Sequence, residues 1–164
     1  MLYNQGVEGV PISLSCAWSN MVGWTIQAEK QTNQIYINVN TGYGGSTSDN
    51  AYRLGAHTTN QIDITNYSKF IVEFNSVAFN PTYWLALAIG KYVTISGGKD
   101  YSITQPTTQI AILSGNGKFS KSNFYGELDI SSYTGNYYLA AHGMSRYDSS
   151  SYYTTIAIKS MRLE

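Results

Sequence analysis

The sequence predicts an all-β domain, an antiparallel sandwich of about ten short strands. Apolar residues recur with a period of two far more often than with the helical period of about 3.6. Runs rich in Ile, Val, Thr and Tyr are separated at short intervals by turns rich in Gly, Asn and Ser. The 164 residues correspond to one domain, 1–164, which can bury a core without disulfides. This prediction holds equally for a fragment of a longer protein.

The expected strands follow the alternation along the chain. Residues 35–39 alternate between apolar and polar, whereas 70–74 and 84–89 are largely apolar on both faces, which predicts central strands covered on each side. Residues 26–32 are helix-compatible in composition, but no apolar partner stands at helical spacing, so no helix is expected there. Further strands are expected at Ile12–Trp18, 51–57, 108–113, 124–130, 137–144 and Tyr153–Leu163.

A seven-residue pattern occurs twice. Ile-Asp-Ile-Thr-Asn-Tyr-Ser at 62–68 matches Leu-Asp-Ile-Ser-Ser-Tyr-Thr at 128–134. Each copy predicts a strand end followed by a tight turn: a structural aspartate, a hydroxyl that bonds the turn, and a tyrosine folded over the end of the sandwich. The residues concerned are Asp63, Thr65 and Tyr67 in the first copy and Asp129, Ser131 and Tyr133 in the second.

Charge and composition exclude several classes of partner. Ten Lys and Arg balance ten Asp and Glu, which argues against nucleic acid and against an anionic membrane. No run of 18 apolar residues predicts a membrane span, and residues 1–9 lack the features of a secretion signal. The single Cys16 cannot close an internal disulfide. The 19 Ser, 15 Thr, 13 Asn and 15 Tyr suit a neutral polar ligand, and they also suit ordinary β-structure.

Several motifs recur in an order that points to a known group of domains. They are Leu-Tyr-Asn-x-Gly-x-Glu at 2–8, Gly-Trp at 23–24, Tyr-Arg at 52–53 leading into 58–69, and the stretches 128–138 and 158–164. In these motifs the chain resembles β-sandwich domains in tail proteins of phages and prophages of Gram-positive bacteria. The resemblance implies a jelly-roll-like sandwich, similar to a carbohydrate-binding module, at the C-terminal end of a virion tail or cell-surface protein. It also implies attachment to a bacterial surface glycan without catalysis.

Catalytic and metal chemistry find little support in the residues. A glycosidase needs two carboxylates about 5 to 9.5 Å apart, one of them kept protonated, and Glu73 and Glu127 are better explained as residues on the solvent face of strands. His57 and His142 show no zinc-ligand spacing and are expected to be hydrogen-bonded structural residues. No metal site or cofactor is predicted, although a structural calcium ion near residues 49–50 stays open.

A sugar site needs an exposed aromatic ring beside polar groups that can form paired hydrogen bonds. Three parts of the chain offer this mixture: residues 43–53, residues 146–152, and the start of the strand at 84–89. For the tryptophan of the third part a core position is the alternative, and the tyrosine at the end of the second part also fits the start of the last strand. The candidate ligand-binding residues are Tyr43, Asp49, Arg53, Trp84, Arg146, Tyr147, Asp148 and Tyr152.

The favoured hypothesis is a non-catalytic module that recognises a bacterial surface glycan in phage-tail or cell-surface adhesion. The alternative is a structural or assembly domain of a tail or fibre whose surface contacts other subunits, in which case a homo-oligomer is expected. A glycan hydrolase acting through Glu73 or Glu127 is the third hypothesis.

Overall fold

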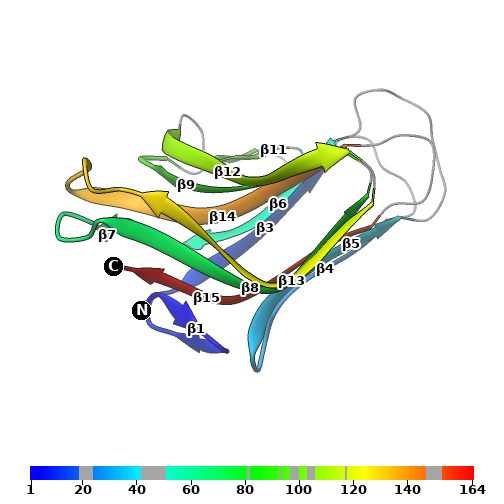
Figure 1. The fold of residues 1–164 in the computed structure, drawn as a ribbon, viewed down its shortest axis with the longest axis horizontal. Helices are drawn as coiled ribbons and strands as arrows, with labels where there is room; N and C mark the ends of the chain where they lie inside the picture. Colours follow the sequence, from blue (N-terminus) through cyan, green and yellow to red (C-terminus); the bar gives the residue numbers. More distant parts are fainter. Residues whose placement is uncertain are drawn as a thin grey trace.

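The computed structural model describes residues 1–18, 24–41, 51–80, 82–92, 94–96, 100–102, 106–116, 118–146 and 153–164. In this part of the chain every regular element is a strand, and two antiparallel sheets lie face to face (Figure 1). The predicted all-β sandwich is confirmed. The helix-compatible stretch at 26–32 lies almost entirely within the edge strand β4 (Trp24–Gln31). No helix among these residues is long and apolar enough to cross a membrane.

The two sheets contain more strands than the ten expected, because several short pairings extend them. The first sheet has seven strands: β1 (Tyr3–Asn4), β2 (Val7–Glu8), β4, β5 (Gln34–Thr41), β8 (Lys69–Asn80), β13 (Phe119–Asp129) and β15 (Tyr153–Leu163). The second has six: β3 (Ile12–Trp18), β6 (Ala51–Thr58), β7 (Ile62–Asp63), β9 (Thr82–Gly90), β12 (Pro106–Asn116) and β14 (Asn136–Arg146). A separate hairpin joins β10 (Thr94–Ser96) to β11 (Asp100–Ser102).

The long strands are connected as a jelly roll. Strand β5 pairs with β15, β6 with β14, β8 with β13, and β9 with β12, so the first half of the chain folds back antiparallel on the second half. Successive pairs belong to alternate sheets, which gives the orders β5-β15-β8-β13 and β6-β14-β9-β12. This is the double Greek-key arrangement of a jelly roll, and it confirms the jelly-roll-like topology that the resemblance implied.

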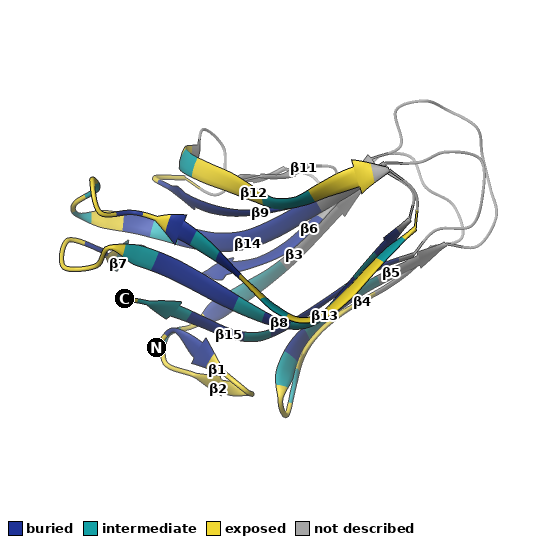
Figure 2. Ribbon diagram, viewed as in Figure 1, coloured by how far each residue is buried: buried dark blue, intermediate teal, exposed yellow. Residues whose placement is uncertain are grey.

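The core lies between the two sheets and follows the alternation in the sequence. Strands β8 and β9 each have a neighbouring strand on both sides, as their apolar faces predicted, and both contribute buried residues to one core cluster. Figure 2 shows that long parts of both strands are buried. The largest fully buried side chains are Tyr3, Phe70, Phe74, Phe79, Ile35, Ile37, Leu54, Ile64, Leu85 and Leu87. Burial of one such side chain contributes roughly 1.5–3 kcal/mol, so the alternation specifies which face of each strand turns inward.

The repeated pattern forms two matching turns at one end of the sandwich. In each copy the aspartate accepts hydrogen bonds from the backbone N–H and the hydroxyl of the residue two positions on: Thr65 for Asp63 and Ser131 for Asp129. The two turns also bond each other, because Ile130 N donates to Ser68 O and Gly135 N donates to Thr65 Oγ1. The predicted structural role is therefore confirmed.

The two tyrosines of the repeated pattern behave differently. Tyr133 packs against the core, whereas Tyr67 is 41% exposed and does not cover the end of the sandwich as predicted. The N–H of each residue bonds the carbonyl three positions back, so the two turns share their backbone geometry. The difference therefore lies in the neighbours that each ring meets.

Candidate functional site

In three neighbouring strands of the first sheet, the alternation of core-facing residues shifts by one position at the same level. In β8 the core-facing residues run through Phe70, Val72 and Phe74, then shift by one position to Val77 and Phe79. Strand β15 makes the same shift beyond its Ile158, and β13 makes it between its two phenylalanines. Figure 1 shows that β13 bends about midway along its length.

An unmatched or strained residue marks the shift in each strand. The pairing of β15 with β8 skips Asn75 on one side and Lys159 on the other, which are β-bulge positions. In β13 the level of Asn75 is occupied by Asn123, which has a φ of 51°. Asparagine adopts this left-handed conformation more readily than most residues because its short polar side chain bonds locally.

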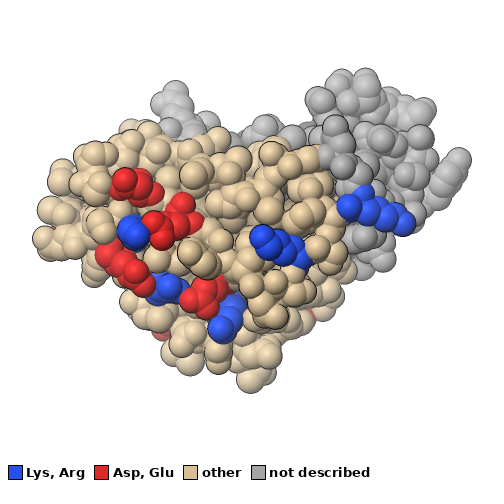
Figure 3. Space-filling view, viewed as in Figure 1, with Lys and Arg blue, Asp and Glu red and all other residues tan. Residues whose placement is uncertain are grey.

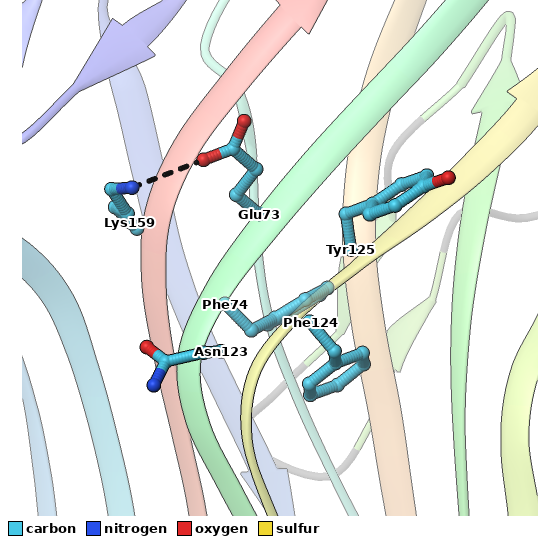
Figure 4. Close-up of a pocket in the computed structure, with 6 residues that line it drawn as sticks. All are labelled: Glu73, Phe74, Asn123, Phe124, Tyr125 and Lys159. Atoms are coloured by element: carbon cyan, nitrogen blue, oxygen red, sulfur yellow. Dashed lines mark ion pairs between the residues drawn. The ribbon is translucent and has the colours of Figure 1, made fainter.

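A cavity of about 180 Å³ opens on the outer face of the sheet at this bend. Phe74 and Phe124 also contribute to its lining, and their rings stack with centroids 4.9 Å apart, but Phe74 is buried and belongs to the core. Its polar lining consists of Glu73, Asn123 and Lys159, with Tyr125 completing the wall. Figure 4 shows Tyr125 and Lys159 on opposite sides of the cavity, with Glu73 between them.

The carboxylate of Glu73 is held by two cations. Arg162 Nη1 donates to Glu73 Oε1 at 2.5 Å, and Lys159 Nζ lies 3.3 Å from Glu73 Oε2. The hydrogen bond from Arg162 is the largest cause that lowers the pKa of Glu73, with Lys159 adding to it against partial burial. At neutral pH Glu73 is therefore an ionised and positioned acceptor.

Further ion pairs lie on the same strands beyond the cavity lining. Arg162 also donates to Glu164 at 2.7 Å, and Lys69 pairs with Glu127 at 2.8 Å. Figure 3 shows acidic and basic side chains intermingled on one face of the molecule. The cavity therefore has polar donors and acceptors in a nearly neutral setting.

The Tyr125 ring is 65% exposed, whereas Tyr3, Tyr83 and Tyr137 are buried. Its place follows from strand pairing, since Tyr125 stands directly opposite Glu73 in the pairing of β13 with β8. Residues opposite each other in an antiparallel pair share a face of the sheet. The phenol ring and the carboxylate thus project from the same surface beside the cavity.

This combination suits a small polar ring. A hydroxyl can donate to Glu73, the Lys159 ammonium and the Asn123 amide can donate to ligand oxygens, and the Tyr125 face can take C–H groups. The cavity is smaller than the roughly 300–1,000 Å³ of pockets for drug-sized ligands. It is therefore suited to one ring of a larger molecule rather than to a whole chain.

Most of the sequence-predicted site falls outside the described residues. Tyr43, Asp49, Tyr147, Asp148 and Tyr152 all lie there. The other three candidate residues lie within the described part of the chain, so at least their backbone can be placed. They are Arg53, Trp84 and Arg146.

The backbone shows how these positions relate to one another. Arg53 and Arg146 lie in β6 and β14, and Arg146 pairs with Ala51 on one side and with Thr82 on the other. The strand ends that flank residues 42–50 and 147–152 are therefore adjacent. Jelly-roll pairing thus brings one attachment point of each predicted segment to the same end of the second sheet.

Trp84 lies on the outer face of the second sheet and not beside the cavity. It is partly buried, and its ring meets His142 edge-on at 5.0 Å. Both the expected alternatives, core residue and open platform, thus describe it incompletely. By strand alternation Trp84 shares this outer face of β9 with the buried Ala86.

The two histidines are buried on the same outer face. His57 Nδ1 lies 2.9 Å from the Thr58 carbonyl oxygen, and burial lowers the pKa of His57. Strand β11 of the separate hairpin contacts β3 and β6, and β6 is the strand that carries this histidine. The position fits the structural role predicted for His57. No group of three or more His, Cys, Asp or Glu side chains gathers at a possible metal site in the described part of the chain.

The prediction that Glu73 and Glu127 lie on the solvent face is confirmed for both. Tyr125, Asn123 and Lys159 were not predicted as neighbours of Glu73. One signal was available, because the apolar positions of β8 change from even to odd numbers after Phe74. Such a change of phase indicates a bulge. It does not show which residues of other strands stand beside it.

Comparison with known proteins yields similarities of shape alone. No protein-family model and no curated protein sequence matches the chain. The enzymatically active domain of tailspike protein 4 of bacteriophage CBA120 has a TM-score of 0.47 and 10% identity, covering 92% of this chain and 19% of that one. The chain thus spans about a fifth of the tailspike chain.

Two further solved structures are carbohydrate-binding modules by name. TmCBM61, solved in complex with β-1,4-galactotriose, has a TM-score of 0.40 and 13% identity over 86% of this chain and 88% of its own. TmCBM27, described for specific mannan recognition, has a TM-score of 0.32 and 9% identity over 92% and 99%. The sandwich topology of this chain is established by its own strand pairing and not by these similarities.

Proposed function

We propose that this chain is a non-catalytic glycan-binding module that holds one sugar ring of a bacterial surface polysaccharide in the cavity at the bend of β8, β13 and β15. The observation that carries the proposal is the exposed Tyr125 ring beside the Glu73 carboxylate, which Arg162 and Lys159 hold in place. An exposed ring next to a fixed hydrogen-bond acceptor is the combination that a pyranose needs, since its C–H face is apolar and its rim carries hydroxyls.

The charge balance of the site favours a neutral sugar. Glu73 and Lys159 both line the cavity, so an anionic group would approach one carboxylate and a cationic group one ammonium. A neutral hydroxyl can serve both, donating to Glu73 and accepting from Lys159. The low overall charge of the chain, with 12% charged residues, agrees with a neutral ligand.

A binding role suits Glu73 better than an acid–base role. A glycosidase general acid needs a raised pKa and a second carboxylate across the bond. The pKa of Glu73 is lowered, and among the described residues that line the cavity Glu73 is the sole carboxylate. We therefore assign no catalytic residue and no cofactor.

The predicted segments at 43–53 and 146–152 remain part of the proposal as a second contact region. One attachment point of each segment lies at the same end of the second sheet. A polysaccharide is long enough to contact more than one part of a module. The motif resemblance supports placing the module at the tip of a phage tail or on a cell surface, with a host wall polysaccharide as the partner.

Titration calorimetry with isolated cell-wall polysaccharide of Gram-positive bacteria tests the proposal. We expect the wild type to bind and Tyr125→Ala to weaken binding about tenfold or more, because a stacked ring and its buried area contribute more than about 1 kcal/mol. Tyr92→Ala is the matched control, since Tyr92 is 67% exposed but does not line the cavity. It is expected to bind like the wild type.

Two other outcomes are informative. Binding that survives Tyr125→Ala but is lost in Tyr147→Ala would move the site to the second contact region and contradict the cavity assignment. Absence of binding to every wall polysaccharide tested would contradict the function itself. Release of reducing sugar during the titration would contradict the non-catalytic assignment.

A further inference from the structure

One edge of the second sheet differs from the other edges of the fold. Strand β12 pairs with β9 on one side, and no strand pairs with its other side in the described part of the chain. Its 11 residues, Pro-Thr-Thr-Gln-Ile-Ala-Ile-Leu-Ser-Gly-Asn, contain no charge. An edge strand exposes a row of backbone N–H and C=O groups, so an uncharged edge is a template for another strand.

The remaining long edge strands are protected. Strand β13 carries Lys121, Glu127 and Asp129, and β4 carries Glu29 and Lys30. Charges at these positions oppose strand addition. Strand β3 is also uncharged, but the β10–β11 hairpin packs against it. Among the described edges, β12 alone combines lack of charge with lack of cover.

Register shifts divide the open edge into short regular segments. The pairing of β12 with β9 shifts register between Pro106 and Thr108 and again between Ala111 and Leu113. Regular pairing therefore covers Thr108–Ala111 and, beyond the second shift, Leu113–Asn116. We call the first segment, Thr108–Ala111, which carries the exposed Ile110, the β12 window. Bulges at both ends prevent a long strand from continuing past it. The partner that fits is another equally short segment.

The side chains of the β12 window divide by face. Ile110 stands opposite Leu87 on the core-facing side, yet it is 44% exposed because it lies at the rim of the sandwich. Gln109 stands opposite Ala88 on the outer face and is exposed. One face of the window thus offers an uncovered isoleucine and the other an uncharged amide.

We propose that the β12 window pairs with the β12 window of a second copy of this chain, antiparallel, across a two-fold axis. An axis perpendicular to the sheet keeps the faces matched, so Ile110 meets the inner face of the second window and Gln109 meets the outer face. If the axis passes Gln109, Gln109 lies opposite its own copy and Ile110 lies diagonal to its copy. If the axis passes Ile110, the two residues exchange these relations. In both registers each residue is within reach of cross-strand contact with its copy.

The composition of the β12 window favours a second copy over another partner. Two uncharged windows do not repel each other, and the formal charge of the whole chain is zero. The pairing extends the second sheet across both copies and removes two exposed edges at once. It also covers the exposed part of Ile110 with apolar groups.

This inference is independent of the proposed glycan site. The cavity lies in the first sheet and the β12 window in the second. If both proposals hold, a dimer carries two cavities, and a repetitive polysaccharide gains avidity from binding both. Failure of either proposal leaves the other intact, because one is measured by ligand titration and the other by molecular mass.

Sedimentation equilibrium over a range of concentrations tests the dimer. We expect the wild type to approach twice the monomer mass of 18.1 kDa as concentration rises. Gln109→Lys and Gln109→Glu are each expected to be monomeric, because like charges face each other beside the axis. An equimolar mixture of these two variants is expected to recover the dimer, since opposite charges then meet.

The matched control is Gln27→Lys, an exposed position on the edge strand β4 of the other sheet, which is expected to dimerise like the wild type. A single cooperative denaturation transition in each variant shows that it folds. A wild type that stays monomeric at all concentrations overturns the proposal. So does a trimer, a dimer that persists in Gln109→Lys, or a mixture that stays monomeric.

Discussion

The Lys159 ammonium lies 3.3 Å from the Glu73 carboxylate, although strand register places Ser160 opposite Glu73. Lys159 is the residue that the pairing of β15 with β8 skips, and a bulge re-aims the side chain at such a position. The cavity lining therefore depends on one extra residue in β15. Without the bulge, a regular strand would turn Lys159 toward the opposite face from its neighbour Ser160.

The free energy of unfolding is expected to decrease as the pH is lowered through the range in which Glu73 becomes protonated. The pKa of Glu73 is lowered in the folded state, chiefly by Arg162, so its contribution is fully present above its unfolded value of 4.5. It is lost as pH falls from there through the lower folded pKa. In Glu73→Gln this part of the acid loss is expected to be absent. Urea denaturation at pH 7 and at several values below 4.5 measures it.

Part of the acid loss is expected to remain in Glu73→Gln. The pKa values of Asp63 and Asp129 are also lowered, by hydrogen bonds from Thr65 and Ser131. The matched control is Glu29→Gln, because Glu29 accepts from the amides of glutamines and not from a cation. An acid profile of Glu73→Gln identical to that of the wild type would contradict the assigned role of the ion pairs.

Two substitutions of Asn123 are expected to separate its backbone role from its side-chain role. Asn123→Ala places an ordinary residue at a φ of 51° and is expected to destabilise the fold by about 1 kcal/mol. Asn123→Gly relieves that strain and is expected to be at least as stable as the alanine variant. Both variants remove the amide from the cavity. Polysaccharide affinity is therefore expected to fall in both, and a glycine variant with wild-type affinity would exclude the amide from binding.

Gly126 of β13 lies under Ile112, the bulge residue of β12, and closes the core between the two sheets. A Cβ atom at Gly126 would stand 2.7 Å from Ile112 Cδ1 and 2.8 Å from Ile112 Cγ2. Overpacking of this kind costs about 1–3 kcal/mol, so Gly126→Ala is expected to lower the free energy of unfolding by that amount. Chemical denaturation measures the change.

A double-mutant cycle identifies the cause. In an Ile112→Ala background both close atoms are gone, so the further change Gly126→Ala is expected to cost much less. Equal costs in the two backgrounds would show that Ile112 is not the contact that excludes a side chain. The cycle also tests the bulge, because Ile112 reaches Gly126 from the position that the pairing of β12 with β9 skips.

Local patterns in the chain were sufficient for the class of fold and for the repeated turns. Alternation of apolar residues depends on neighbours in sequence, and so does the bond from Thr65 to Asp63 two positions away. The resemblance added the jelly-roll topology, which the pairing of β5 with β15 and of β6 with β14 confirmed. Tyr67 shows the limit of this reasoning, because its exposure depends on contacts that the pattern does not encode.

The candidate site depended on tertiary structure. Glu73 could be assigned to a solvent-facing position from its apolar neighbours, but its partners Arg162, Lys159 and Tyr125 are between 52 and 89 positions away in the numbering. The sequence by itself determined that the alternation of apolar residues in β8 shifts by one position after Phe74, because this depends only on the order of residues along one strand. Only strand pairing aligned that change with irregularities in two other strands, because the register between distant segments is set by the packing of the whole sandwich.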